Sequence, residues 1–552
     1  MSQAPAIDAS AGAPPPLTPA DEPSPPPPGY YLPLASDPTQ PGILAGSDHG
    51  PHLEIETDVC VIGSGAGGAV VAAALAERGA RVVVVEEGDY LSGQQFNQRE
   101  DLMLRALFQE RGGRSTHDRS ITILQGRGVG GSPVHNTCLA FRAPAPVLEG
   151  WAKSSGLESL SPEEMARFYE HIERAVDVKP ILEREVNAHN RVLLDAMRRL
   201  HWRGGLAHHN RTECLECGFC ELGCAYDRKN NTLKVWIPRA VRAGARVFSQ
   251  CRVDRLTMEG AGSTQRCRGV TGVIVKGPAE EAAGTFRLRA HRTIVAAGAI
   301  HTPILLRRSG VARAGEALFL HPAVAVGGLF PHPLDSWAGL PQSVYCDEFG
   351  PLDAPPDETE FLLLHSFAHP IGTAVNLAGF GTQHRAMMRR YRHMAAITPM
   401  VLHDQPALAR VDEDRSGRPR IRYQLSQLDI ERLRHGSARA AEALFAAGAL
   451  EVSLPGTSGR LYARLEDAQR AARQLDLAPL TAQVLSTHPQ GTCPMGPPER
   501  GGVVDGHGAP HGTEGLWVVD ASIFPGSLGA PPQITIMALA LRLAVHLSQV
   551  DA

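Results

Sequence analysis

The hydrophobic pattern of the chain changes abruptly near Thr57. Residues 1–50 contain four consecutive prolines (25–28) and many Ala, Ser and Gly residues. The apolar run TDVCVIG (57–63) and the run RVVVVEEGDY (81–90) then flank an Ala- and Val-rich stretch of helical length. Runs of this length and β-branched content are typical of buried strands. The pattern predicts a strand, a glycine turn, a helix and a second strand, which is a βαβ unit.

The rest of the chain predicts two interleaved domains. Buried-strand and glycine-turn character returns at 121–142, 292–310 and 515–547, helical patterns fill 160–200, 427–450 and 461–475, and short β-like runs occur at 361–367 and 410–425. A chain of 552 residues is expected to form more than one packed region. We expect a disordered or loosely docked tail over 1–50, since it has too little apolar material to offset the entropy of ordering. One domain is assigned to 51–150, 205–310 and 485–552, and a substrate-facing domain to 151–204 and 311–484.

Charge and composition exclude several classes of protein. The formal net charge is -4 and no block of like charges occurs, which argues against a nucleic-acid-binding protein and against steering to anionic membranes. No stretch of 18 uncharged apolar residues occurs, and the N-terminus lacks the regions of a signal peptide. We therefore expect a cytoplasmic protein with no membrane span. The richness in Ala, Gly, Pro and Arg suggests a bacterial source, and the sequence is silent on oligomeric state.

The first glycine turn has the spacing of a dinucleotide-binding loop. Gly63, Gly65 and Gly68 form G-x-G-x-x-G directly after the first predicted strand. In such a loop the first glycine makes the turn, the second admits a pyrophosphate and the third lets the helix pack closely on the strand. Glu86 ends the second strand, where an acid binds ribose hydroxyls. These features predict a dinucleotide site but do not distinguish FAD from NAD.

Four further motifs resemble those of the glucose-methanol-choline (GMC) oxidoreductases. They are GRGVGGSPVHN (126–136), IVAAGAIHTPILLRRSG (294–310), THPQGTCPMG (487–496) and GLWVVDASIFPGSLGAPPQITIMALALRLA (515–544). The resemblance implies an α/β fold, with an FAD-binding, Rossmann-like domain of the glutathione-reductase type and an α+β substrate domain with a mixed sheet. It also implies FAD-dependent oxidation of an alcohol to a carbonyl, with electrons passed to oxygen or a redox partner. Weak aromatic content and the run FLLLHSF (361–367) favour an uncharged aliphatic or alicyclic alcohol.

The resemblance also implies which residues form the site. The FAD set would be Gly63, Gly65, Gly68, Glu86, Gly130, Gly131, Ser132, Asn136, Gly298, Asp520 and Ala521. His488 matches the active-site histidine, and a neutral imidazole suits a base that takes the hydroxyl proton as hydride leaves. The remaining histidines, including His321, lack metal-ligand spacing and are expected to be structural or exposed.

The sequence departs from the family at the second catalytic position. Alignment of the C-terminal helix places Pro531 where relatives have Asn or His, and proline has no side-chain donor. Gln533, or a residue of the substrate domain, would have to replace it. The alternative is a flavoprotein of this fold without alcohol oxidation, acting in electron transfer, in assembly or in a non-oxidative reaction.

Two more features leave alternatives open. His135 resembles a histidine bonded covalently to FAD in the choline-oxidase branch, although simple packing over the flavin edge is favoured, and Thr137 would tune polarity beside it. Cys214, Cys217, Cys220 and Cys224 have the spacing C-x2-C-x2-C-x3-C of iron–sulfur proteins. A similar set occurs in bacterial FAD-dependent glucose dehydrogenases, and a Cys-rich insert occurs in long-chain alcohol oxidases. An iron–sulfur cluster and structural thiols or disulfides are equally favoured, ahead of zinc.

Overall fold

The computed structural model describes residues 42–260, 265–276, 280–311, 313–365, 369–456 and 459–549. Residues 1–41, most of the expected tail, lie outside the described residues. The last part of the segment assigned to the tail is folded, because Ile43–Ala45 form strand β1, which pairs in parallel with β8 (Arg246–Ser249). Ile43 and Ala45 are buried there, so the folded part begins before residue 50.

A nine-stranded sheet carries the predicted βαβ unit. Among the described residues the strand order is β1-β8-β3-β2-β11-β10-β21, with β22 on β11 and β9 on β10. Its other strands are β2 (His52–Ile62), β3 (Val82–Val85), β9 (Cys251–Glu259), β10 (Gln265–Lys276), β11 (Glu281–Val295), β21 (Thr513–Glu514) and β22 (Leu516–Val518). β2 is parallel to β3 and β11, whereas β10 is antiparallel to β9 and β11. All four valines of β3 are buried, as expected for a parallel strand covered on both faces.

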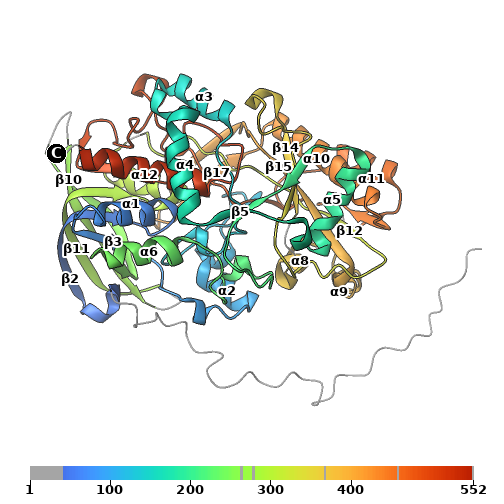
Figure 1. The fold of residues 1–552 in the computed structure, drawn as a ribbon, viewed down its shortest axis with the longest axis horizontal. Helices are drawn as coiled ribbons and strands as arrows, with labels where there is room; N and C mark the ends of the chain where they lie inside the picture. The colour runs from blue at the N-terminus through green and yellow to red at the C-terminus, as the bar shows by residue number, and fades with distance from the viewer. Residues whose placement is uncertain are drawn as a thin grey trace, which may run out of the picture. The chain divides into compact units, whose positions relative to one another are not determined.

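Three helices lie side by side on one face of this sheet: α6 (Thr232–Arg242), α1 (Ala66–Ala76) and α12 (Gln533–Gln549) (Figure 1). α12 also packs against α4 (Pro162–Ala175), whose buried side chains join the same core. The sequence pattern assigned α4 to the substrate domain. The structure differs because the apolar face of α4 is covered by α12. Three more helices are α2 (Glu100–Leu107), α3 (Ala145–Ser155) and α7 (Gly298–Arg308).

The second sheet has seven strands among the described residues, in the order β19-β18-β12-β15-β14-β13-β6. They are β6 (Gly204–Leu206), β12 (Val326–Leu329), β13 (Val344–Cys346), β14 (Phe361–His365), β15 (Met394–Val401), β18 (Glu451–Ser453) and β19 (Leu461–Tyr462). The pairs are antiparallel, and α5 (Ala188–Leu200) and α10 (Gln427–Ala446) pack on them, with α11 (Leu465–Arg473) against α10. A separate core therefore forms around this sheet.

A parallel strand pair extends the second sheet toward the first. β4 (Ile121–Ile123) and β20 (Val484–Ser486) are parallel, and Ala323 bridges both Met400 of β15 and Leu485 of β20. With this extension the sheet is mixed, as the resemblance implied. The chain that leaves β20 carries His488 into the space between the two cores. The remaining pairs are β5 (Val178–Pro180) with β7 (His208–Asn210), and β16 (Leu408–Glu413) with β17 (Pro419–Gln424).

Two short helices lie in the connection between two neighbouring strands of the second sheet. α8 (Pro370–Asn376) and α9 (Gly381–Met388) lie between β14 and β15, which pair directly with each other. In Figure 1 both helices lie beyond the ends of these strands, away from the sheet. None of the described helices has both the length and the apolar character needed to cross a bilayer.

Candidate functional site

One cavity joins the glycine loop to His488. It has a volume of about 1810 Å³, and its lining includes Gly63 and Gly65, which mark what we call the nucleotide end, His135 and Asn136, and His488, which marks what we call the far end. Its walls come from both sheets and from the α8–α9 insertion. The fold therefore places the predicted nucleotide loop and the predicted catalytic histidine in a single space.

The glycine loop has the geometry that its sequence predicts. Gly63 has a φ of 91°, which a residue with a side chain rarely adopts. A Cβ on Gly68 would lie 1.9 Å from the carbonyl oxygen of Gly63, so only glycine lets α1 pack this closely on β2. A Cβ on Gly65 would meet only Gly131, at 3.9 Å. α1 then begins without a side-chain cap, which leaves its N-terminal N–H groups for an anion.

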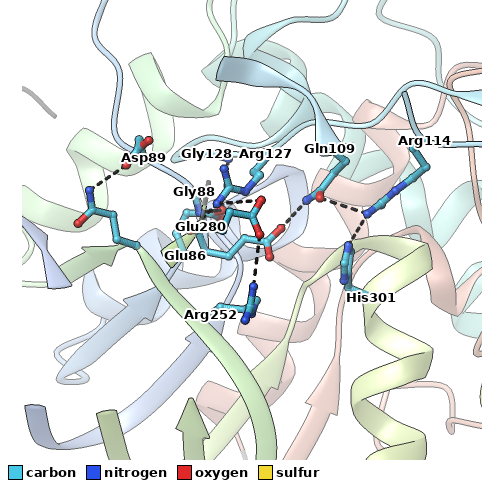
Figure 2. A network of polar contacts seen from close by, with 12 residues as sticks. Glu86, Gly88, Asp89, Gln109, Arg114, Arg127, Gly128, Arg252, Glu280 and His301 are labelled. Carbon is cyan, nitrogen blue, oxygen red and sulfur yellow. Dashed lines mark hydrogen bonds and ion pairs between the residues drawn. The ribbon is translucent and has the colours of Figure 1, made fainter. Parts of the chain in front are cut away.

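Glu86 connects the loops around this end of the cavity (Figure 2). One carboxylate oxygen accepts the N–H and the hydroxyl of Ser64, at 3.1 and 2.8 Å. The other accepts the N–H groups of Gly88 and Gly128, at 3.0 and 3.3 Å. Burial raises the pKa of this carboxyl above its usual value. Glu86 thus lies where the sequence predicted a ribose-binding acid, and in this arrangement it also fixes the backbone around the loop.

A buried arginine, which sequence reasoning missed, holds the adjoining wall. Arg114 donates to Gln109 (3.1 Å), Gln125 (2.6 Å) and Nε2 of His301 (2.7 Å), as Figure 2 shows for Gln109 and His301. A guanidinium only donates, so Nε2 of His301 is unprotonated. Burial and Arg114 lower the pKa of His301 to about 4. In sequence, Arg114 stands in a polar run without any motif, and no local signal identifies it.

The second glycine segment packs directly on the first. Gly130 donates its N–H to the hydroxyl of Ser64 at 3.0 Å, and a Cβ on Gly131 would lie 2.6 Å from the Cα of Gly65. Ser132 accepts the N–H of Gly126 at 2.9 Å. The structure therefore brings together the two glycine segments that the sequence assigned to one cofactor.

His135 lies in the cavity wall and is buried. Its ring lies against Phe108, with 4.0 Å between centroids and the two rings tilted by 44°, and its Nε2 is buried without a hydrogen-bond partner in the described structure. Burial lowers its pKa to about 3. A buried polar atom without a partner, next to two glycine segments, fits a polar ring system bound in the cavity. Thr137, two residues on, also lines the cavity and donates its hydroxyl to Gln342.

The amide of Gln533 is fully used by the protein. Its oxygen accepts from the side chain of Asn136 at 2.7 Å, and its nitrogen donates to the carbonyl of Leu139 at 2.6 Å and lies 3.3 Å from Asn210. No polar atom of Gln533 is left to face a substrate in this arrangement. The structure therefore assigns it a positioning role for Asn136, and Pro531 stays in the cavity wall without a donor.

Asp520 links the C-terminal motif to α7. It accepts the N–H of Gly298 (2.9 Å), the hydroxyl of Thr302 (2.5 Å) and the N–H of Ser522 (2.8 Å). Ala521 accepts the N–H of Gly491 at 2.9 Å. Gly298, Asp520 and Ala521 all line the cavity, and their contact with FAD stays a prediction.

His321 contacts the predicted catalytic histidine, contrary to the expectation that it is merely structural or exposed. Its Nε2 accepts the N–H of Gly529 and the side-chain amide of Gln490, each at 3.1 Å. The orientation of that amide is set, because its oxygen accepts the N–H of Leu528 at 3.0 Å. A ring nitrogen that accepts hydrogen bonds carries no proton, so neutral His321 is protonated on Nδ1.

This pattern fixes the proton of His488. The Nδ1 atoms of His321 and His488 lie 3.2 Å apart. Since His321 is the donor, Nδ1 of His488 accepts and its own proton is on Nε2. That atom has no hydrogen-bond partner among the described residues, and the ring lines the cavity. Burial lowers the pKa of His321 to about 3 and that of His488 well below its usual value, so both rings are neutral.

The cysteine window does not form a metal site in this structure. Within the described residues no group of three or more His, Cys, Asp or Glu side chains is placed to hold a metal ion. Cys214 accepts the N–H of Glu216 at 3.4 Å and Cys224 accepts that of Arg228 at 3.1 Å, while Cys220 lies beside Cys138. None of the four is in a disulfide with a described residue. Burial and the neighbouring thiols of the window raise the pKa of Cys214 and of Cys217, so the four side chains lie near one another, and two of the sulfurs also accept backbone N–H groups of their own loop.

Comparisons with known proteins agree with these motifs. Models described as GMC oxidoreductase match residues 104–323 and 407–540, and a model described as an NAD(P)-binding Rossmann-like domain matches residues 61–131. An uncharacterised GMC-type oxidoreductase of Mycobacterium tuberculosis is 33% identical over 496 residues, which cover 88% of this chain and 75% of that protein. A long-chain-alcohol oxidase of Arabidopsis thaliana is 28% identical over 523 residues, which cover 90% of this chain and 67% of that one.

Solved structures share the fold. A formate oxidase variant from Aspergillus oryzae has a TM-score of 0.67 at 15% identity, covering 90% of this chain and 99% of its own. Pyridoxine 4-oxidase from Mesorbium loti has a TM-score of 0.66 at 18% identity, covering 89% of this chain and 99% of its own. At these identities the likeness extends to the fold alone.

Proposed function

This chain belongs to the GMC oxidoreductase family, and on that premise we propose that it uses FAD to oxidise an uncharged aliphatic or alicyclic alcohol to a carbonyl compound. The observation that carries the proposal is the single cavity that joins the glycine loop to His488. The electrons would pass to oxygen or to another acceptor.

The residues of the cavity fit FAD. The N-terminus of α1 and Gly65 would hold the pyrophosphate, Glu86 the ribose, and the segment from Gly130 to Asn136 the flavin side. The buried Nε2 of His135 would gain the partner that it lacks. When bound, FAD supplies the acceptor for the hydride of the alcohol. The covalent bond at His135 stays a prediction.

The wall beyond His488 favours an apolar substrate. The cavity-lining residues from β12, β14, β15 and β20 are Gly327, Gly328, Leu329, Leu364, Met394, Ala395, Ala396, Thr398, Met400, Leu485 and Ser486, and none of them is charged. Glu451 of β18 also lines the cavity, but its carboxylate is paired with Arg390. Burial of CH₂ groups against the uncharged residues would contribute to the affinity for an apolar substrate. The long-chain-alcohol oxidase among the relatives is consistent with such a substrate.

His488 would contact the alcohol oxygen through Nε2. In the tautomer set by His321, this atom is an N–H donor that would hold the alcohol oxygen in place and stabilise negative charge that develops on it. The base role predicted from the sequence requires a free lone pair on Nε2 instead. Both roles need a neutral ring, which burial favours.

Two variants of His488 test the proposal. In the FAD-loaded protein under anoxic conditions, a panel of primary, secondary and long-chain alcohols should bleach the visible flavin band. His488→Ala should slow bleaching on the order of 10²–10³-fold with the FAD content unchanged. His488→Gln keeps an N–H donor but cannot act as a base, so it should retain more activity than His488→Ala. Equal loss in both variants would favour the base, and full activity in His488→Ala would overturn the proposal.

Pro531 supports one rival function. It lies in the cavity wall at the position of the missing donor, which fits a flavoprotein without alcohol oxidation. If no alcohol bleaches the wild-type flavin and Pro531→Asn creates bleaching, the rival is favoured. If the wild type is bleached, the rival is excluded.

A further inference from the structure

Residues 369–393, which contain α8 and α9, form an exposed segment at the cavity that we call the flap. From Pro370 to His393 no side chain is buried. Glu100 on α2 accepts the N–H groups of Ile371 and Gly372, at 2.6 and 2.7 Å, and so holds the start of α8. Nε2 of His384 lies 2.8 Å from the carbonyl oxygen of Ala374 and joins the two helices. Polar contacts of this kind hold the flap, while its apolar side chains face outward or into the cavity.

Large apolar side chains of the flap are exposed to water. Phe380 is 94% exposed, Val375 64% and Ile371 40%. Ile371 and Val375 are four residues apart on α8 and therefore share one face. A grouped, exposed apolar surface of this kind indicates a partner rather than a random surface position.

The charge of the flap is opposite to that of the whole chain. Residues 369–393 contain four arginines and no Asp or Glu, whereas the chain has a net charge of -4. Arg390 pairs with Glu451 at 3.2 Å and Arg392 with Asp335 at 2.8 Å. Arg385 and Arg389, four residues apart at the end of α9, form no ion pair with a described residue. Two cations are thus available beside the exposed apolar groups.

The flap also forms part of the cavity wall. Ile371, Val375, Leu377 and Met387 line the cavity that contains His488. Val375 is both exposed and cavity-lining, so the flap borders the opening. An occupant of the outer surface would therefore lie next to the path into the site.

We propose that residues 369–393 bind the surface of an anionic phospholipid bilayer. Phe380 and Val375 enter the boundary between headgroups and acyl chains, and Arg385 and Arg389 contact the phosphate or carboxylate groups. The net charge of the whole chain opposes an anionic surface, but this segment contains a free arginine pair and an exposed aromatic without any acidic residue, so its local charge favours a negatively charged apolar surface. Binding needs no catalysis. The further step, passage of an apolar alcohol from the bilayer into the cavity, rests on the proposed function.

Vesicle binding by the FAD-loaded full chain tests the proposal. The protein should sediment with vesicles of phosphatidylcholine and phosphatidylserine, more weakly with phosphatidylcholine alone, and less as salt increases. The double variant Arg385→Gln, Arg389→Gln should bind about 30-fold more weakly. Phe380→Ser should bind about tenfold more weakly.

Matched controls lie elsewhere on the surface. Arg415→Gln with Arg473→Gln removes the same charge from exposed positions outside the flap, and Leu480→Ser removes an apolar side chain that is 78% exposed. Both should bind vesicles as the wild type does. All six positions are exposed, and matching thermal unfolding curves would confirm that the variants fold.

Several outcomes overturn the proposal. They are absence of wild-type binding to the anionic vesicles, equal binding by the flap variants, and equal loss in the controls. If the wild type ignores vesicles but Phe380→Ser converts a dimer to a monomer in sedimentation equilibrium, the flap is an interface between two copies. Bleaching by a short alcohol without vesicles should be unchanged in the flap variants, so failure to dock and failure to oxidise are distinguishable.

Discussion

The two ends of the cavity are built in different ways. The nucleotide end is formed mainly by backbone: Gly63 and Gly68 allow α1 to meet β2, Gly131 packs on Gly65, and Glu86 fixes the surrounding turns. The far end depends on side chains from distant segments. In sequence, His321 lies 167 residues before His488 and 208 residues before Gly529, whose N–H orients its ring.

The nucleotide end should therefore tolerate a change of side-chain chemistry but not of shape, and the far end should tolerate a change of shape but not of chemistry. At the nucleotide end, N–H groups belong to every residue, so the essential feature is the absence of a Cβ. At the far end, space is less critical than the identity of each donor and acceptor, because one ring sets the proton on the next. The following substitutions test this contrast.

The largest effect is expected from Gly68→Ala. The new Cβ would lie 1.9 Å from the carbonyl oxygen of Gly63, and backbone cannot move away as a flexible side chain can. We expect a loss of at least about 3 kcal/mol in the free energy of unfolding and loss of bound FAD. Thermal unfolding and flavin absorbance after gel filtration measure both.

Gly150→Ala is the matched control. A Cβ at this exposed position of α3 meets nothing within 4 Å, so helix propensity should stabilise the variant by about 0.5–1 kcal/mol. If Gly68→Ala retains FAD and stability as well as the control does, close helix packing is not what the nucleotide end requires.

The far end should lose rate rather than cofactor when His321 is replaced by alanine. The variant removes the donor that holds the proton of His488 on Nε2, and we expect a fall in the bleaching rate of roughly 10²-fold with normal FAD content. A structural role alone would lower stability without changing the pH profile of bleaching. A new pH dependence is therefore the diagnostic result, and an unchanged profile would contradict the tautomer argument.

The fold was predictable where its signals are local. The βαβ unit follows from two apolar runs around a glycine turn, and α10, α11, β14, β16 and β17 fall in the predicted helical and β-like runs. The assignment of α4 was not predictable, because its amphipathic pattern shows that one face is buried but not which core covers it. β1 was missed because three residues in a Pro- and Gly-rich context give no periodicity.

The candidate site divides in the same way. Most of the residues identified from motifs line one cavity: Gly63, Gly65, Gly131, Gly298, His135, Asn136, Asp520 and His488. Gly68 and Gly130 lie behind its lining and pack against Gly63 and Ser64. Arg114, His321 and Gln490 were not, since each acts through a partner far away in sequence. For the cysteine window the sequence left an iron–sulfur cluster and structural thiols or disulfides equally favoured, because ligand spacing does not determine where the sulfurs point.

A smaller effect is expected at the contact between the two ends, where Gln533 holds Asn136. Gln533→Leu would leave the amide of Asn136 and the carbonyl of Leu139 without a buried partner, at a cost of about 2 kcal/mol in unfolding free energy. The flavin spectrum should shift because Asn136 is freed. Gln427→Leu, which removes an exposed amide on α10, should change stability by less than about 0.5 kcal/mol. Equal effects would mean that the Gln533 contacts contribute nothing.

The smallest effect is expected on the pH dependence of stability, and it distinguishes two buried histidines, His301 and His209. His301 at the nucleotide end has Arg114 on its Nε2, whereas His209, on β7, is buried outside the cavity lining and contacts the backbone of Gln342. Burial lowers the pKa of His209 to about 3. In the unfolded chain the ring is protonated below its ordinary pKa of about 6.5, whereas in the folded protein it stays neutral. The free energy of unfolding therefore falls as the pH decreases through that range.

His209→Gln removes this dependence. When the pH is lowered from about 7.5 to about 5.5, the variant should gain about 1.4 kcal/mol in unfolding free energy relative to the wild type. Urea unfolding of both proteins at the two pH values measures this change. The difference at the higher pH gives the effect of the substitution on stability that does not depend on protonation. A difference that is the same at both values would mean that His209 is solvated in the folded protein and that its surroundings are more open than their packing indicates.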